Sequence, residues 1–138
     1  MKILVDTSIW SLAFRKKEKN ERELEIVSTL SKLIRDLHVV IIGPIRQEIL
    51  SGISESSKFD ELRNKMSIFP DHEINTEDYE LAAMYYNGCR RNGIQGSHID
   101  YLICAVAFNN NYSILTLDND FTNYQKHTDI KIVDIKSV

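Results

Sequence analysis

Four carboxylate residues draw attention because each lies at an end or along an edge of an expected secondary-structure element. They are spread along the chain: Asp6, Glu48, Asp100 and Asp118. Carboxylate oxygens are the ligands that hard divalent cations such as Mg²⁺ and Mn²⁺ prefer. Four carboxylates about 5 Å apart repel one another by roughly 3 kcal/mol per pair at an effective dielectric of about 20. Such a cluster therefore indicates a bound cation, which could activate a water against a phosphodiester.

The segments that must position these residues alternate between two kinds of pattern. Short apolar or β-branched runs predict strands at 2–5, 38–42, 112–117 and 130–133, with a weak additional strand at 66–69. Capped, amphipathic or apolar stretches predict helices at 9–14, 21–37, 44–53, 75–91, 99–108 and 120–124. In the second helix the apolar stripe is expected to run from Leu24 through Leu30 to Leu37. Strands alternating with helices indicate an α/β fold whose parallel sheet is covered on both faces.

Two of the acids directly follow expected strands. Asp6 and Asp118 would lie at the carboxyl ends of their strands, the edge where parallel sheets bind ligands. If the two strands are neighbours, these residues lie side by side although they are far apart in sequence. Simpler explanations remain open: Asp6 could cap the following helix, and Asp118-Asn119-Asp120 could form a turn. The latter also begins like a calcium loop, but it lacks the glycine that an EF-hand requires.

The other two acids lie within expected helices. Glu48 borders the stripe formed by Ile45 and Ile49, so we expect its carboxylate to point partly inward. Asp100 is the only charged residue of the segment 99–108 and has no clearly solvated face. As alternatives, Glu48 could be an ordinary surface group, and Asp100 could complete a capping box with the serine three residues before it.

Composition excludes several classes of protein. The chain has 138 residues, which predicts a single domain over 1–138, and its 43% hydrophobic content is that of a globular protein. The net charge of −3 argues against holding nucleic acid by positive charge alone, but not against a nuclease whose cations supply that charge. The longest apolar run, 101–108, is much shorter than the roughly 20 residues of a membrane span.

The cysteine content and the first residues suggest a cellular location. Cys89 and Cys104 stand alone without a CxxC pair, which excludes a disulfide framework and a thiolate zinc site. The first residues lack the pattern of a signal peptide. These features predict a cytoplasmic protein without a membrane association.

Three short motifs resemble those of the PIN-domain ribonucleases. Asp6-Thr7-Ser8-Ile9-Trp10 resembles the opening motif of that family, residues 100–107 resemble its third acidic motif, and residues 114–121 resemble its fourth. Glu48 fits the second acidic position. The motifs occur in the family's order and span nearly the whole chain, and the resemblance is closest to the VapC-type toxins of toxin–antitoxin pairs.

This resemblance implies a three-layer α/β/α sandwich with a central, mainly parallel sheet. It also implies a Mg²⁺- or Mn²⁺-dependent endoribonuclease that acts on RNA, forms a homodimer and is restrained by a cognate antitoxin protein. The implied catalytic and metal-binding acids are Asp6, Glu48, Asp100 and Asp118, with Asp6 and Asp100 as the foremost ligands. The implied supporting residues are Thr7, Ser8, Thr116 and Asp120, the last with a variable role.

Other functions fit parts of the same sequence. A housekeeping PIN-domain ribonuclease in RNA processing would carry the same acids, and so would an acidic interaction module that has lost catalysis. A haloacid-dehalogenase type of phosphatase needs a second aspartate at the position of Ser8, and no receiver-type acidic cluster is found. Four basic residues could contact phosphates or form a solvated loop, which we favour: Arg15, Lys16, Lys17 and Lys19.

Overall fold

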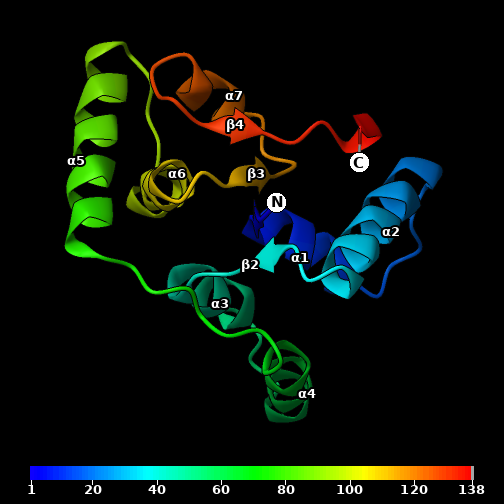
Figure 1. Cartoon of the computed structure of the whole chain (residues 1–138). Helices are drawn as coiled ribbons and strands as arrows, with labels where there is room; N and C mark the ends of the chain where they lie inside the picture. Colours follow the sequence, from blue (N-terminus) through cyan, green and yellow to red (C-terminus); the bar gives the residue numbers. More distant parts are fainter. Residues whose placement is uncertain (138) are drawn as a thin grey trace.

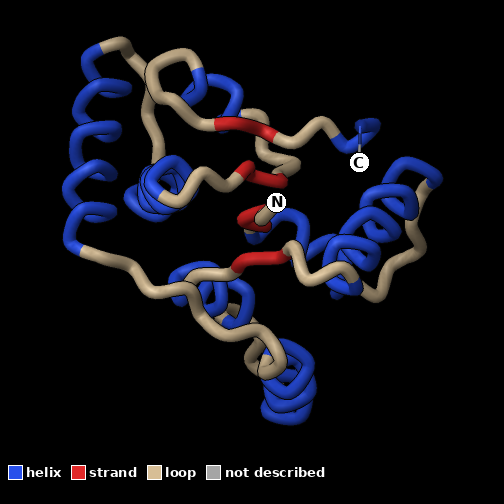
Figure 2. Tube along the Cα trace, in the orientation of Figure 1, coloured by secondary structure: helices blue, strands red, loops and turns tan. Residues whose placement is uncertain are grey.

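The centre of the molecule is a four-stranded parallel sheet with helices on both faces (Figure 1). The computed structural model describes residues 1–137. The strands are β1 (Ile3–Val5), β2 (Val39–Val40), β3 (Ser113–Leu115) and β4 (Lys131–Ile132). Their order is β2-β1-β3-β4, and every neighbouring pair is parallel. Figure 2 shows the short strands following one another through the middle of the molecule. The expected three-layer α/β/α fold is confirmed.

Strand β1 occupies the middle of the sheet because its side chains are apolar on both faces. Its three residues are at most 1% exposed. It pairs with β2 on one side and with β3 on the other. The chain therefore first adds β2 on one side of β1 and later adds β3 on its other side. This arrangement creates a crevice at the carboxyl ends of β1 and β3, where open α/β sheets bind ligands.

Seven α-helices surround the sheet in the described part of the chain. Their bounds are α1 (Thr7–Phe14), α2 (Glu21–Arg35), α3 (Gly43–Leu50), α4 (Ser56–Met66), α5 (Thr76–Arg91), α6 (His98–Asn109) and α7 (Asp120–Gln125), followed by a 3₁₀ turn at Ile135–Ser137. In Figure 1, α2 lies on one side of the sheet and α5 and α6 on the other. Helix α6 is buried along 101–107, as its apolar sequence predicts. None of the helices within residues 1–137 is long and apolar enough to cross a membrane.

The weak strand predicted at 66–69 is wrong. Met66 ends α4, and the following residues form a turn. The guanidinium of Arg46 donates hydrogen bonds to the carbonyl oxygens of Met66, at 2.9 Å, and Phe69. These carbonyl oxygens therefore accept hydrogen bonds from a side chain and not from the backbone of a neighbouring strand. Only Asp71 reaches the sheet, through an isolated parallel bridge to Ile41.

The apolar stripe of α2 is displaced from the predicted one. Leu24 is 56% exposed, and Leu37 lies beyond the helix at φ 60° and is 78% exposed. Ile26, Leu30 and Leu33 form the buried face instead. The helix ends before Leu37 because a residue with positive φ cannot continue a right-handed helix.

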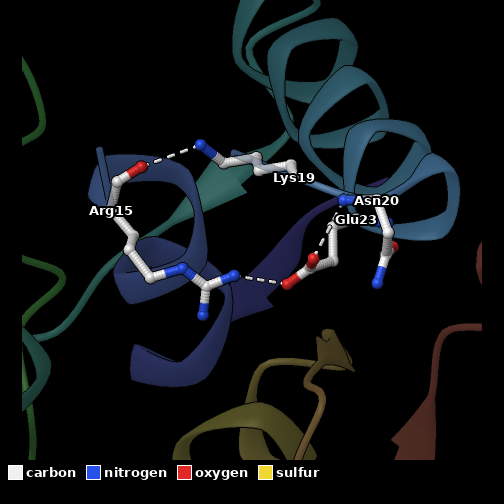
Figure 3. A network of polar contacts seen from close by, with 4 residues as sticks. All are labelled: Arg15, Lys19, Asn20 and Glu23. Atoms are coloured by element: carbon white, nitrogen blue, oxygen red, sulfur yellow. Dashed lines mark hydrogen bonds and ion pairs between the residues drawn. The ribbon is translucent and has the colours of Figure 1, made fainter. Parts of the chain in front are cut away.

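The basic loop between α1 and α2 is partly tied down. Figure 3 shows Arg15, after the last residue of α1, reaching Glu23 of α2 in an ion pair. Lys19 Nζ donates to the carbonyl oxygen of Arg15 at 2.8 Å. Asn20 and Glu23 form a capping box, with the Glu23 backbone N–H donating to Asn20 Oδ1 at 2.9 Å. Two of the four basic residues thus have structural partners within the protein.

Candidate active site

Asp6 lies at the carboxyl end of β1, in the cap position of α1, yet it does not cap that helix. Its side chain makes no capping hydrogen bond. Instead its Oδ2 accepts hydrogen bonds from Ser8 Oγ and Thr116 Oγ1, both at 2.8 Å. The carboxylate is buried, with 6% of the residue exposed. The simple capping explanation for Asp6 therefore does not hold.

Two hydroxyl groups connect Asp6 to the end of β3. Ser8 Oγ accepts a hydrogen bond from the backbone N–H of Leu117 at 3.0 Å, and Thr116 Oγ1 accepts one from that of Asp118 at 3.0 Å. Each hydroxyl thus accepts from the loop after β3 and donates to the same carboxylate oxygen. The other oxygen, Asp6 Oδ1, accepts no hydrogen bond from residues 1–137. One oxygen is held, and the second is available to a ligand.

Asp100 lies in the first turn of α6 and is half-buried. Its backbone N–H donates to the capping oxygen Ser97 Oγ at 3.1 Å. Its carboxylate Oδ2 accepts a hydrogen bond from Tyr124 Oη at 2.7 Å. Burial is the main cause that raises the pKa of Asp100, and the charges of Asp6 and Asp118 raise it further. The hydrogen bonds from Tyr124 and Ser97 act in the opposite direction.

Asp118 and Asp120 lie on the exposed side of the same edge. The backbone N–H of Asp120 donates to Asp118 Oδ1 at 2.9 Å, so the turn interpretation of this segment is correct locally. That turn also opens α7. The charge of Asp118 nevertheless acts on Asp100, which places the three acids Asp6, Asp100 and Asp118 in one electrostatic neighbourhood.

Glu48 does not join this group in the structure. We expected it to point partly inward, but it is exposed, whereas Ile45 and Ile49 of the same helix are buried. It forms no hydrogen bond or ion pair with another described residue. Its charge is not among the main causes that shift the pKa of Asp100. A long side chain at the border of a buried stripe has extended into solvent.

Thr7 lies next to Asp6 and adds a further polar group. Its Oγ1 is buried and has no hydrogen-bond partner within residues 1–137. The predicted supporting residues thus divide into two kinds: Ser8 and Thr116 hold Asp6, whereas Thr7 presents an unsatisfied oxygen.

The donor set fits a cation of the Mg²⁺ type. No group of three or more His, Cys, Asp or Glu side chains among residues 1–137 is arranged so that it could hold a metal ion by itself. Magnesium, however, is usually held by one or two carboxylates and completes its shell with waters and substrate phosphates. Asp6 offers a free carboxylate oxygen, and the charges of Asp6 and Asp118, which add to burial in raising the pKa of Asp100, are charges that a cation would offset.

Sequence reasoning missed Tyr124 and gave Ser97 only part of its role. Tyr124 contacts Asp100 from a different helix, and no spacing in the sequence connects them. Ser97 was identified as a cap but not as a hydroxyl facing the Asp100 carboxylate. In the sequence, Tyr124 is one tyrosine of a short helix, and nothing near it indicates that its hydroxyl donates to Asp100.

Sequence comparison defines the class of protein. The chain matches the PIN domain family over residues 3–127. It belongs to this family, whose members are typically nucleases that use divalent metal ions. No curated protein is similar enough in sequence to match it.

Solved structures show the same fold at low sequence identity. FitAcB from Neisseria gonorrhoeae has a TM-score of 0.77 at 17% identity, covering 99% of each chain. VapBC2 from Rickettsia felis, bound to a DNA fragment from its promoter, has a TM-score of 0.75 at 16% identity, covering 96% of this chain and 98% of that one. FitAB bound to an IR36 DNA fragment has a TM-score of 0.72 at 20% identity, covering 96% and 94%.

Proposed function

We propose that this protein is a divalent-metal-dependent endoribonuclease and the toxin of a type II toxin–antitoxin pair. The observation that carries the nuclease proposal is the pair Asp6 and Asp100 at the carboxyl edge of the sheet. One is buried with an oxygen left free, and the other has a pKa raised by burial and by neighbouring carboxylates. A cation bound between the two residues would use the free oxygen of Asp6 and offset the like charges that act on Asp100.

The proposed role of each residue follows from its burial and its hydrogen bonds. Asp6 and Asp100 would hold Mg²⁺ or Mn²⁺, with Asp118 and Glu48 as further acids on the solvent side. When bound, the cation would lower the pKa of a water and offset the charge of the scissile phosphate. Ser8 and Thr116 fix the Oδ2 atom of Asp6, so its Oδ1 atom keeps one direction.

The remaining acids and the hydroxyl of Thr7 would lie near the bound RNA. Asp118 and Glu48 are exposed, so they can adjust when RNA binds. Asp120 fixes Asp118 through its backbone N–H rather than through its own carboxylate. The unpartnered Thr7 Oγ1 offers a hydrogen bond to a water or to a phosphate oxygen beside Asp6.

The proposed partners follow from the family and from the similar folds. FitAcB, VapBC2 and FitAB support a cognate antitoxin for this chain. We also propose that the chain acts as one domain, as a homodimer, and in the cytoplasm where RNA and antitoxin are present.

The test is cleavage of total RNA and tRNA by the purified protein, with Mg²⁺ or Mn²⁺ and with EDTA. Asp100→Asn should remove cleavage while the fold remains, because the amide oxygen still accepts from Tyr124 but carries no charge. Asp36→Asn, an exposed aspartate at the end of α2, is the matched control. Discrete fragments that require metal and vanish only in Asp100→Asn support the proposal. Metal-independent cleavage, or full activity in Asp100→Asn, contradicts it.

A further inference from the structure

Tyr124 has a contact that packing alone does not require. The residue lies in α7 and is 0% exposed, and its Oη donates to Asp100 Oδ2 at 2.7 Å. Tyr101 lies beside it with a ring-centroid distance of 4.9 Å and is also buried. The hydroxyl of Tyr101, however, has no hydrogen-bond partner within residues 1–137. Of these two neighbouring tyrosines, one is directed at the candidate site.

The position of the Tyr124 hydroxyl is fixed on several sides. Its ring packs against Phe121 at 5.2 Å and against Tyr101. At Gly96, an added Cβ would lie 2.6 Å from Tyr124 Oη and 2.8 Å from Tyr101 Oη, well inside van der Waals contact. The absence of a side chain at position 96 therefore makes the room in which this hydroxyl reaches Asp100.

The carboxylate of Asp100 can rotate about its Cβ–Cγ bond, and the hydroxyl of Tyr124 donates to one of its two oxygens, Oδ2. A hydrogen bond to one oxygen restricts that rotation and fixes the direction of the other oxygen. Asp6 is held in the same way, through Oδ2 alone, by Ser8 and Thr116.

We propose that Tyr124 is a positioning residue that orients Asp100 toward a divalent cation shared with Asp6. This inference rests on the proposed function, because Asp100 must bind a cation for its orientation to matter. Helix α7 directly follows the loop of Asp118, so one short segment supplies both an acid of the site and the hydroxyl that aligns another. Groups that orient metal ligands typically contribute about 10- to 100-fold to affinity or activity.

The test removes single hydroxyl groups and measures cation binding without RNA. Tyr124→Phe deletes the hydrogen bond to Asp100, and Tyr101→Phe deletes the same atom from an adjacent buried tyrosine. The dissociation constant for Mn²⁺ is measured by electron paramagnetic resonance of free Mn²⁺. We expect it to rise about tenfold in Tyr124→Phe and to stay within about twofold in Tyr101→Phe. Equal affinity in wild type and Tyr124→Phe overturns the proposal, as does an equal loss in both variants.

The rate of cleavage at increasing Mn²⁺ concentration is a second measurement, because excess Mn²⁺ would not restore a protein that is merely misfolded. Saturating Mn²⁺ should restore most of the cleavage by Tyr124→Phe, since the defect lies in holding the cation. Circular dichroism should show the same helical content for all three proteins. A wild type that binds Mn²⁺ but cleaves no RNA contradicts the proposed nuclease, while the role of Tyr124 is still decided by the Mn²⁺ affinities. A wild type that binds no Mn²⁺ at millimolar concentration overturns both.

Discussion

The four predicted acids fall into two sets, a held side and an exposed side, which differ in burial and in hydrogen bonds rather than in place. On one side, Asp6 and Asp100 are at least half-buried, and each accepts hydrogen bonds from side-chain hydroxyls. On the other side, Asp118 and Glu48 are exposed and no side-chain hydroxyl within residues 1–137 donates to them. The carboxylates of Asp6 and Asp100 are held in place before a ligand binds, whereas those of Asp118 and Glu48 can change their conformation when it binds.

This difference separates two requirements of a metal-dependent nuclease. Ligands that must meet a small cation benefit from fixed geometry, which needs a supporting layer of hydrogen bonds. Such ordering buries a carboxylate beside like charges, and burial first and the charges of Asp6 and Asp118 second raise the pKa of Asp100. Groups that meet a flexible polynucleotide gain more from freedom of movement. The comparison therefore supports the proposal that the held side binds the cation and that the exposed side adjusts to RNA.

The largest expected effect is a contrast between the two sides in cleavage rate. Asp6→Asn should lower the rate by more than about a hundredfold, because losing a ligand exceeds the loss of an outer partner. Glu48→Gln should lower it by about tenfold or less, since Glu48 has no fixed contact. Initial rates at saturating Mn²⁺ measure both. A larger loss in Glu48→Gln than in Asp6→Asn would reverse the assignment.

A smaller effect is expected from removing one hydroxyl of the held side. Thr116→Val deletes the donor to Asp6 Oδ2 and the acceptor of the Asp118 N–H, with little change of shape. We expect the Mn²⁺ dissociation constant to rise about tenfold. Thr116→Ser keeps the hydroxyl and should bind Mn²⁺ within about twofold of wild type, and isothermal titration calorimetry compares the three proteins. If serine fails to rescue, the methyl group rather than the hydroxyl is what matters at this position.

The electrostatic strain on Asp100 predicts a pH-dependent change in stability. Because its pKa is raised in the folded protein, the folded state holds this proton more tightly than the unfolded chain does. Asp100 therefore makes the free energy of unfolding fall as pH rises from about 4 through the raised pKa. Asp100→Asn removes this penalty and should raise the unfolding midpoint at neutral pH in the absence of metal.

The control for this prediction is the same measurement at acid pH. The difference between wild type and Asp100→Asn should shrink toward zero as pH falls below about 3, where Asp100 is protonated in both states. Thermal unfolding followed by circular dichroism in EDTA gives both midpoints. A variant that is less stable than wild type at neutral pH would show that the charge of Asp100 is not strained.

The smallest effect is expected in the loop shown in Figure 3. Arg15→Gln breaks the ion pair with Glu23, in which both side chains are partly exposed, at 41% and 25%. Such pairs contribute little, so the unfolding midpoint should shift by about 1 °C or less. Cleavage should be unchanged, since Arg15 is engaged with α2. A clear loss of RNA cleavage would instead support phosphate contact by this loop.

Much of the fold was predictable because local patterns and burial agree. The run Ile3–Val5 is apolar on both faces and becomes the central strand, and the apolar segment 101–107 becomes the buried helix. Asp6 and Asp118 were placed at one edge because parallel strands end together. The strand predicted at 66–69 was wrong because the turn there depends on Arg46, a residue some twenty positions away.

The details of the site depend on contacts that a local pattern does not encode. Glu48 was expected to point inward because helix geometry gives only the direction of Cβ, while a glutamate side chain is long enough to turn outward. The hydroxyl of Tyr124 meets Asp100 only when α7 folds against α6. Sequence thus predicted which residues lie at the edge, and the tertiary structure determined which of them are held.

The parallel pairing of β1 with β3 also has a consequence for protein synthesis. Asp6 is translated before Thr116, which donates to it and lies 110 positions later. At about 5–20 residues per second, roughly 6–22 seconds pass between the two during elongation. Throughout that interval the nascent chain carries Asp6 without its second hydroxyl partner and without β3. A ribosome that stalls before this point releases a fragment in which the two strands of the acidic edge have never met.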